Sequence, residues 1–374
     1  MKRLFLILAG FFCALNAWAH KPSDSYLSLV VKDSVISGQW DIALRDLDFA
    51  IGLDANGDAE ITWGEVRAKH AEIDAYAMSR LHLATQDKVC PIQVTERLID
   101  DHTDGAYAVL RFKAQCSAAV SVLQARYTLF FDIDPQHKGL LRLEYQGQSS
   151  TAIFSPDKAS QEFRLNQVSR LQQFVDYARE GVWHIWIGFD HILFLLALLL
   201  PAVVVRQDKK WQAVSAFKPA FWSVLKIVTA FTLAHSITLT LATLGVISLP
   251  SRWVESTIAA SVVIAALNNI FPLFRERRWI MAFLFGLIHG FGFASVLTDL
   301  GLPQGALVLA LVGFNLGVEA GQLAIVAGFL PLAFGLRFSW FYRRLVLLGG
   351  SAIIALLAAI WLVERVFDMK LMPF

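Results

Sequence analysis

Three ionisable side chains interrupt the apolar run that begins near residue 182. They are His184, Asp190 and His191. Ionisable groups inside a bilayer are costly, and they usually face a partner, a cavity or an ion. On one continuous α-helix, His184 and His191 would share a face but stand about 10 Å apart along the axis. The spacing therefore predicts two separate stations. Asp190 would lie about 100° round the helix from His191, where it could orient that imidazole or help bind a cation.

Similar groups lie near the middle of three further apolar stretches. His235, His289 and Glu319 each occupy a different stretch, and by residue counting they lie at about the same membrane depth as His191. We therefore expect His191, His235, His289 and Glu319, together with Asp190, to form one cation site near the membrane midplane. Imidazoles and carboxylates suit divalent transition metals such as nickel, cobalt, zinc or copper. A network of hydrogen bonds between helices, without an ion, is the alternative.

Other polar residues are expected to support this site or to lead to it. Ser236, Asn315 and Gln322 are the supporting groups, and His184 with Glu255 forms an outer entry station. The stretch that carries Glu319 has a second face made of glycines. Gly313, Gly317 and Gly321 form two overlapping GxxxG steps, which allow a neighbouring helix to approach closely.

Hydrophobic residues make up 56% of the chain, and the formal net charge is +2. The first value indicates a membrane protein, and the second suggests neither a nucleic-acid partner nor an acidic substrate. Six apolar stretches are long enough to span a bilayer. They cover residues 182–205, 221–247, 253–274, 279–297, 306–330 and 345–363. Lys and Arg concentrate in alternate loops, which the positive-inside rule assigns to the cytoplasm. Both termini, including a tail at 367–374, would then be periplasmic, in a bacterial inner membrane.

The N-terminus has the pattern of a secretory signal. Lys2 and Arg3 precede an apolar core, and Ala-Trp-Ala at 17–19 is a typical cleavage site. The mature chain would begin at His20, whose α-amine and imidazole could chelate a metal together; a solvated side chain is the alternative. Cys90 and Cys116 are then an even pair in an oxidising compartment, which predicts a disulfide, with two separate buried thiols as the alternative.

Residues 20–165 are expected to form a small, mainly β exported domain, a sandwich with one helical insert. The strand-like stretches are 26–31, 35–44, 106–114 and 121–133, with two more at 140–145 and 151–154. Residues 166–181 have an apolar stripe typical of an amphipathic linker helix on the membrane surface. The six-helix domain follows at 182–366.

The helical insert resembles an EF-hand loop at 54–65. Oxygen ligands occur at the required positions, and Ala59 stands where the sharp turn normally has Gly. The expected calcium ligands are Asp54, Asn56, Asp58, Glu60 (through its carbonyl), Thr62 and Glu65. The alternative is an Asx-rich turn that caps a following helix at 62–83.

Several of these motifs together resemble the HupE/UreJ family of membrane proteins, in the branch with a signal peptide and a periplasmic domain. The matching segments are His-Lys-Pro-Ser-Asp-Ser at 20–25, Gly-Phe-Asp-His at 188–191, Ala-His-Ser at 234–236, His-Gly-Phe-Gly-Phe at 289–293 and Phe-Asn-Leu-Gly-Val-Glu-Ala-Gly-Gln at 314–322. The resemblance implies nickel or cobalt permeation, or an accessory role for hydrogenase or urease. Nickel–cobalt permeases share H-x4-D-H, whereas five residues separate His184 from Asp190 here.

Two classes of function follow from these expectations. The first is an integral inner-membrane permease for a nickel- or cobalt-like cation. The second is a membrane-embedded zinc hydrolase in which three His residues hold Zn²⁺, Glu319 or Asp190 is the base and Ser236 assists. An accessory or assembly protein for a metalloenzyme is a third reading. A permease needs an aqueous path to both membrane faces, whereas a hydrolase needs a dead-end cavity or an opening to lipid.

Overall fold

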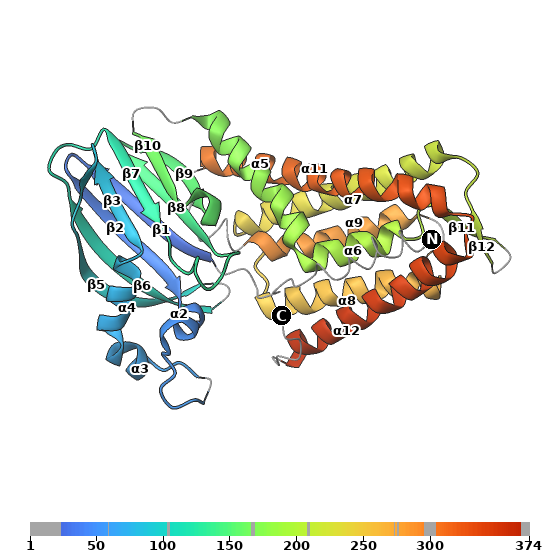
Figure 1. Ribbon diagram of the computed structural model, residues 1–374, viewed down its shortest axis with the longest axis horizontal. Helices are drawn as coiled ribbons and strands as arrows, with labels where there is room; N and C mark the ends of the chain where they lie inside the picture. The colour runs from blue at the N-terminus through green and yellow to red at the C-terminus, as the bar shows by residue number, and fades with distance from the viewer. Residues whose placement is uncertain are drawn as a thin grey trace.

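The computed structural model describes residues 24–58, 60–102, 105–165, 169–207, 210–272, 274, 277–294 and 304–367. A β-rich domain lies at one end of an elongated helical part (Figure 1). The expected signal peptide, His20, Ala59 and nearly all of the expected C-terminal tail lie outside the described residues.

Two sheets form the N-terminal domain. The first has the order β5-β6-β2-β1-β8-β9, and the second has the order β10-β7-β3-β4. Their bounds are Asp24–Lys32 (β1), Val35–Ala43 (β2), Leu81–Thr85 (β3), Lys88–Val89 (β4), Ile92–His102 (β5), Gly105–Gln115 (β6), Val122–Tyr127 (β7), Lys138–Tyr145 (β8), Gln148–Phe154 (β9) and Ser160–Arg164 (β10). Side chains of both sheets, such as Leu29, Trp40 and Leu123, share one hydrophobic core. The burial of alternate residues explains why most strands could be predicted from apolar alternation.

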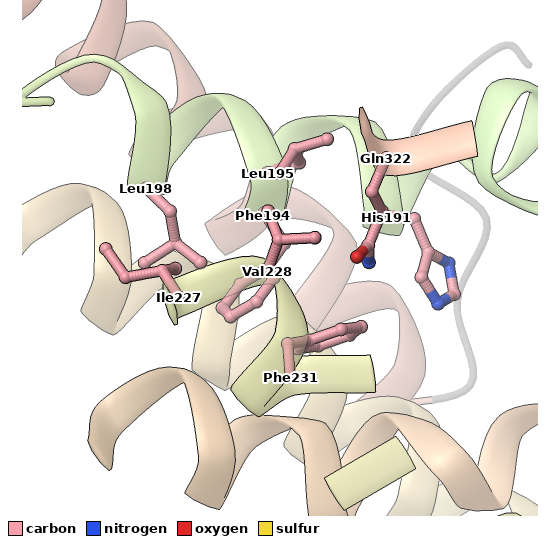
Figure 2. A pocket seen from close by; sticks show the side chains of 8 residues that line it. All are labelled: His191, Phe194, Leu195, Leu198, Ile227, Val228, Phe231 and Gln322. Carbon is pink, nitrogen blue, oxygen red and sulfur yellow. The ribbon is translucent and has the colours of Figure 1, made fainter. Parts of the chain in front are cut away.

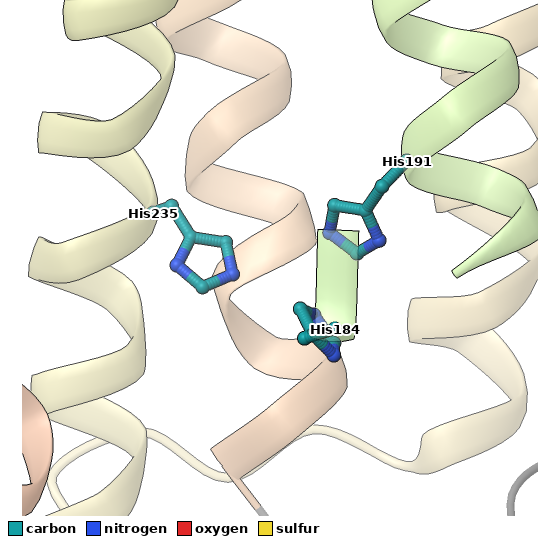
Figure 3. Close-up of side chains that lie close together, drawn as sticks. All are labelled: His184, His191 and His235. Atoms are coloured by element: carbon teal, nitrogen blue, oxygen red, sulfur yellow. The ribbon is translucent and has the colours of Figure 1, made fainter. Parts of the chain in front are cut away.

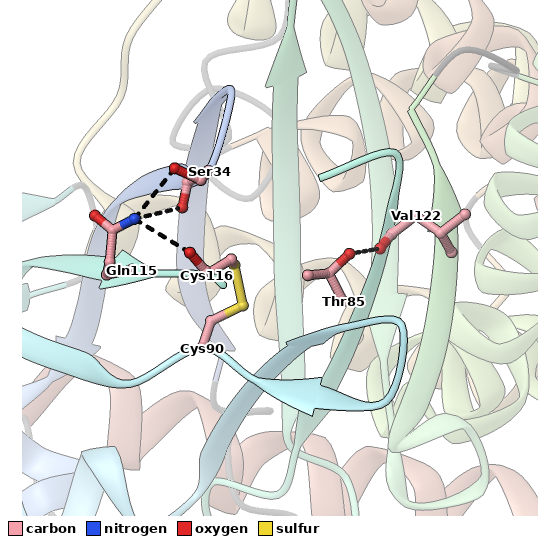
Figure 4. Close-up of a disulfide and its surroundings, with 6 residues drawn as sticks. All are labelled: Ser34, Thr85, Cys90, Gln115, Cys116 and Val122. Atoms are coloured by element: carbon pink, nitrogen blue, oxygen red, sulfur yellow. Dashed lines mark hydrogen bonds between the residues drawn. A yellow bond between two sulfur atoms is a disulfide. The ribbon is translucent and has the colours of Figure 1, made fainter. Parts of the chain in front are cut away.

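A disulfide joins Cys90 to Cys116 beside this core (Figure 4). Both cysteines are buried, and Cys116 donates its backbone N–H to the Ser34 carbonyl. The bond ties the segment that follows β4 to the end of β6, which belong to different sheets.

The helical insert consists of three short helices. They are α2 (Leu44–Ile51), α3 (Trp63–Ala68) and α4 (His70–Met78). The single helix expected over 62–83 is wrong. The helix is interrupted at Lys69, between α3 and α4, and strand β3 begins at Leu81. The loop at 54–62 therefore connects helix α2 to helix α3.

The C-terminal part consists mainly of helices. They are α5 (Arg170–Ile187), α6 (Phe189–Leu199), α7 (Phe217–Thr243), α8 (Ser251–Ile270), α9 (Arg278–His289), α11 (Gln304–Leu336) and α12 (Gly350–Phe367), with short turns η2 (Gly290–Phe293) and η3 (Tyr342–Gly349). A hairpin of β11 (Val204–Gln207) and β12 (Lys210–Ala213) joins α6 to α7. Among the described residues, four helices are long and apolar enough to cross a membrane: Phe217–Thr243, Ser251–Ile270, Ala306–Leu336 and Tyr342–Phe367.

The first expected span is not one straight helix. Helix α5 runs without a break through the expected boundary at residue 181, and the chain then turns by 70° into α6. The pair could make one broken span, and the apolar segment Arg278–Phe293 is shorter than a full span.

Helix α11 packs its glycine face against α5. A Cβ at Gly317 would lie 1.9 Å from the carbonyl oxygen of Ala178, and one at Gly313 would lie 2.8 Å from that of Phe174. Gly181 of α5 makes the matching close approach, since a Cβ placed there would lie 2.1 Å from the carbonyl oxygen of Phe314. The two backbones touch, as the GxxxG pattern predicts.

Candidate metal centre

The turn between α5 and α6 places His184 beside His191. Gly188 forms this turn, and a Cβ there would lie 2.5 Å from the His184 carbonyl oxygen and 3.0 Å from Nδ1 of His191. Only glycine leaves room for this geometry. The ring centroids of His184 and His191 are 4.5 Å apart. The expected separation of about 10 Å is wrong, because it assumed a continuous helix.

Two sets of potential ligands meet at this point. His184, His191 and His235 form the first set, and Asp190, His191 and His289 form the second. Within each set, one potential ligand atom from each residue lies within 4.8 Å of the others. Figure 3 shows the first three imidazoles converging from α5, α6 and α7. His191 belongs to both sets.

The imidazoles are enclosed by aromatic rings. The exposed fraction is 4% for His191, 0% for His235 and 1% for His289. The enclosing side chains are Phe194 and Phe231, which pack on His289, and Phe293 and Phe314, which pack on His184. Such a shell excludes water and lowers the local dielectric constant, so a charge inside it interacts strongly with nearby groups.

Asp190 fixes the orientation of His191. Nδ1 of His191 lies 2.9 Å from Oδ1 of Asp190 and donates to it, because an ionised carboxylate only accepts. Asp190 is in the first turn of α6, where the helix dipole favours a negative charge. Nε2 of His191 therefore carries a lone pair.

Asn315 fixes the orientation of His235. The amide nitrogen of Asn315 donates to the Leu311 carbonyl at 2.8 Å, so its oxygen is the acceptor 3.3 Å from Nδ1 of His235. Nδ1 of His235 then carries the proton, and Nε2 has the lone pair.

Ser261 fixes the orientation of His289. The Ser261 hydroxyl donates its one proton to the Ile258 carbonyl at 2.6 Å. Nε2 of His289, which lies 2.9 Å from the same oxygen, must therefore donate to it. This leaves the lone pair of His289 on Nδ1. Histidine ligands of metals are typically held in this way through their second nitrogen.

The nitrogens that remain are buried and have no hydrogen-bond partner among the described residues. They are Nε2 of His184, Nε2 of His191, Nε2 of His235 and Nδ1 of His289. For three of them, the hydrogen bonds above assign a lone pair to that atom. The arrangement offers neutral imidazole donors and one carboxylate, a set that suits first-row divalent metals.

A family model matches residues 159–365, which is more than half of the chain, and its description is HupE / UreJ protein. The chain belongs to the HupE/UreJ family. No curated protein matches the chain significantly. The matched residues include every member of both ligand sets.

Members of the HupE/UreJ family are associated with nickel or cobalt transport, or with urease and hydrogenase maturation. Together with the long apolar helices, this membership makes the chain a membrane protein.

Glu319 lies apart from both ligand sets. Its carboxylate accepts from the Thr229 hydroxyl at 3.0 Å, and neither set includes it. The expected role of Glu319 as a ligand is therefore not supported. The physical reason is that α11 turns this face toward the length of α7. Gln322 on the same face is buried and accepts from Thr232 at 3.1 Å.

Two other expected site residues have different partners. Glu255 pairs with Arg365 of α12 at 3.2 Å and accepts from the Ser251 hydroxyl, and it belongs to neither ligand set; its station with His184 stays a prediction. The hydroxyl of Ser236 donates to the Thr232 carbonyl of its own helix at 2.7 Å. Both sets of partners depend on how the helices pack, which spacing along one helix cannot decide.

Sequence reasoning did not single out Ser261 or the phenylalanine rings. Ser261 is a hydroxyl in the middle of an otherwise apolar helix, and this could have indicated a buried partner. Phe194 and Phe231 gave no such signal, because aromatic residues are common in apolar helices.

A small cavity begins at His191 and Gln322 and continues between α6 and α7 (Figure 2). Its other lining residues are Phe194, Leu195, Leu198, Ile227, Val228 and Phe231. Beyond His191 the lining is therefore almost wholly apolar.

The loop at 54–65 is closed by its own hydrogen bonds. Asp54 accepts from Gly57 N–H at 2.7 Å, and Asp58 accepts from Glu60 N–H at 2.9 Å. Glu65 and Thr62 form a capping box at the start of α3. Donation from the Thr62 backbone N–H is the main cause that lowers the pKa of Glu65 below its ordinary value. The side chain of Asn56 donates to Asp58 at 2.8 Å, so this side chain also turns toward the loop.

Proposed function

We propose that this membrane protein is a permease for a divalent transition-metal cation of the nickel or cobalt type. The observation that supports it best is the group of buried imidazole nitrogens without partners, converging from α5, α6, α7 and α9. Each buried acceptor left without a partner costs about 1–3 kcal/mol. Four such nitrogens, of which three are assigned a lone pair, are costly for a purely structural network, and a bound cation would use lone pairs from among them.

The ligands for the cargo would come from His184, His191, His235 and His289, with Asp190 as the one negative charge. Asp190, Asn315 and Ser261 position three of the imidazoles through the hydrogen bonds described above. Because neutral imidazoles bind metals, protonation competes with the cation.

The hydrolase alternative receives less support from the geometry. Of its expected helpers, Glu319 bonds to Thr229 and the Ser236 hydroxyl donates within its own helix. Only Asp190 remains near the imidazoles, and it already accepts from His191. The cavity beside His191 is lined mostly by large apolar side chains, which leave little room for a polar substrate.

We also propose the orientation expected from the loop charges, with the β domain in the periplasm. Arginines from two of the basic loops bond to backbone carbonyl groups near the β11–β12 hairpin, which lies in a third: Arg278 bonds to Pro201, Arg337 to Val214 and Arg343 to Trp211. This end lies opposite the β domain in Figure 1. A shared basic end supports one cytoplasmic face, and the Cys90–Cys116 disulfide is compatible with an oxidising compartment for the β domain.

The test uses full-length protein in lipid nanodiscs and in proteoliposomes. Equilibrium dialysis with Ni²⁺ or Co²⁺ measures binding, and an internal metal-sensitive dye measures uptake. His191→Ala should weaken binding at least about 100-fold, since losing a ligand exceeds the 10–100-fold cost of losing a positioning partner. Ser351→Ala is the control, because it removes a buried hydroxyl in α12 that bonds to Asn269. Wild-type protein that binds neither metal would contradict the proposal, and binding without uptake would favour the accessory reading.

A further inference from the structure

We propose that the metal centre consists of two overlapping stations that hold one cation alternately, with His191 shared between them. Station one is His184, His191 and His235, and station two is Asp190, His191 and His289. This inference rests on the permease proposed above and adds the route of the ion within it.

The two stations lie on different sides of His191. Ring centroids are 4.5 Å apart for His184 and His191, and 5.3 Å apart for His191 and His289. Phe231 packs against His191, His235 and His289. No described ligand set contains His235 and His289 together. The four imidazoles are therefore too spread out to serve one ion at bonding distance, which is about 2.0–2.1 Å for a metal such as zinc.

The stations also differ in charge. Station one offers only neutral imidazoles, whereas station two includes the Asp190 carboxylate. In a water-excluded interior a carboxylate attracts a dication strongly, so station two binds the cation more tightly than station one on electrostatic grounds. One carboxylate cannot neutralise two dications separated by a single imidazole ring. Occupancy of one station therefore disfavours occupancy of the other.

The order of the stations follows from their neighbours. His184 belongs to α5, whose first half is held against the β domain by ion pairs such as Lys158 with Asp176. Phe194 and Phe231 pack on His289 and also line the apolar cavity, which extends toward Leu198 and Ile227. Station one thus faces the β-domain side, and station two faces the cavity that leads toward the basic end.

His191 can serve both stations without releasing the ion. It is the only described residue common to both sets. Nδ1 of His191 is bonded to Asp190, so Nε2 is the nitrogen that His191 offers to the ion. We infer that the cation passes from the nitrogens of His184 and His235 to His289 and Asp190 while it stays bound to His191.

Cobalt(II) is the probe, because its visible absorption reports the ligands and their geometry. Full-length protein in nanodiscs is titrated with Co²⁺ and compared with His235→Ala, His289→Ala, the double variant and His82→Ala. His82 is an exposed histidine in the β domain and serves as the control for losing an imidazole. Uptake into proteoliposomes is measured in parallel.

Wild type should bind one Co²⁺ per chain. Each single variant should still bind one Co²⁺, with an affinity loss of about 10-fold and with a different spectrum, since one retains station two and the other station one. The double variant should lose at least about 100-fold. Both single variants should lose uptake despite binding.

Three results would overturn the two stations. They are single variants that lose binding as completely as the double variant, single variants with identical spectra, or two Co²⁺ ions bound to wild type at once. In each of these cases wild type still binds and transports the metal, so the permease itself stands. If wild type binds no Co²⁺, both proposals fail together.

Discussion

The imidazoles of His184 and His191 lie with their ring centroids 4.5 Å apart, although an unbroken helix would hold them about 10 Å apart. The turn at Gly188 produces this contact, and Asp190 lies in the first turn of the helix that follows it, 2.9 Å from His191. One glycine therefore assembles three potential ligands from a single stretch of eight residues.

Gly188→Ala should destroy this assembly. Its Cβ would lie 2.5 Å from the backbone carbonyl oxygen of His184, 3.0 Å from Nδ1 of His191 and 3.1 Å from Oδ1 of Asp190. We expect Ni²⁺ affinity to fall at least about 100-fold, which equilibrium dialysis can measure. Gly335→Ala is the matched control, because a Cβ there meets nothing within 4 Å. Unchanged affinity in Gly188→Ala would show that the close approach is not required.

Gly317→Ala should separate α5 from α11. The new methyl group would meet the carbonyl oxygen of Ala178, a backbone atom that moves only with its helix. Overpacking of this kind costs about 1–3 kcal/mol, and the displacement should also weaken metal binding through His184. Thermal unfolding in detergent and Co²⁺ titration measure the two effects. Gly328→Ala, on an open part of α11, should change neither.

Ser261→Ala should weaken metal binding without removing a ligand. It deprives Nε2 of His289 of its acceptor, so the tautomer and ring orientation are no longer fixed. Affinity for Co²⁺ should fall by no more than the about 10-fold expected for His289→Ala, because the station without His289 remains. Ser261→Thr keeps the hydroxyl and should restore most of the affinity. If alanine and threonine variants bind alike, Ser261 does not position His289.

The contact of Asp157 with Arg179 should make docking of the β domain on α5 depend on pH. A hydrogen bond from Ser155, followed by Arg179 at 2.7 Å, lowers the pKa of Asp157 below its ordinary value. A carboxyl with a depressed folded-state pKa contributes stability above its unfolded pKa near 4 and loses it as pH falls through the folded value.

Asp157→Asn should therefore cost at most about 1 kcal/mol at pH 7, since the pair is partly exposed, and nothing at a pH below the folded pKa. Denaturant unfolding at several pH values measures this difference. In a double-mutant cycle with Arg179→Gln, the two losses should overlap rather than add. Additive losses at pH 7 would mean that the two side chains do not interact.

We expect calcium to stabilise the β domain through the loop at 54–65. At a free concentration ten times Kd, binding to the folded state adds about 1.4 kcal/mol, so millimolar Ca²⁺ should raise the Tm of the full-length protein. Glu65→Gln should remove this response. Glu60→Gln should keep it, because position 7 of such a loop supplies its backbone carbonyl. An unchanged Tm of wild type in millimolar Ca²⁺ would refute the site.

Local pattern was enough to predict the N-terminal strands that alternate in burial, such as β1 and β6, and the glycine face of α11. Alternation with period two and the GxxxG spacing are direct consequences of strand and helix geometry. Strand β3 was missed because Leu81–Thr85 continues an apolar pattern that also fits a helix, and only pairing with β7 decides between them.

The sequence by itself determined which chemistry is available: histidines and an aspartate within apolar stretches, where an unpaired polar group is too costly to be incidental. Only the tertiary structure decided which of them meet. His184 joins the cluster because the chain turns at Gly188, and Glu319 stays outside because α11 presents it to Thr229. Spacing along a chain fixes positions on one helix, whereas a ligand set depends on distances between helices, and these are set by packing at contacts such as Gly317 on Ala178.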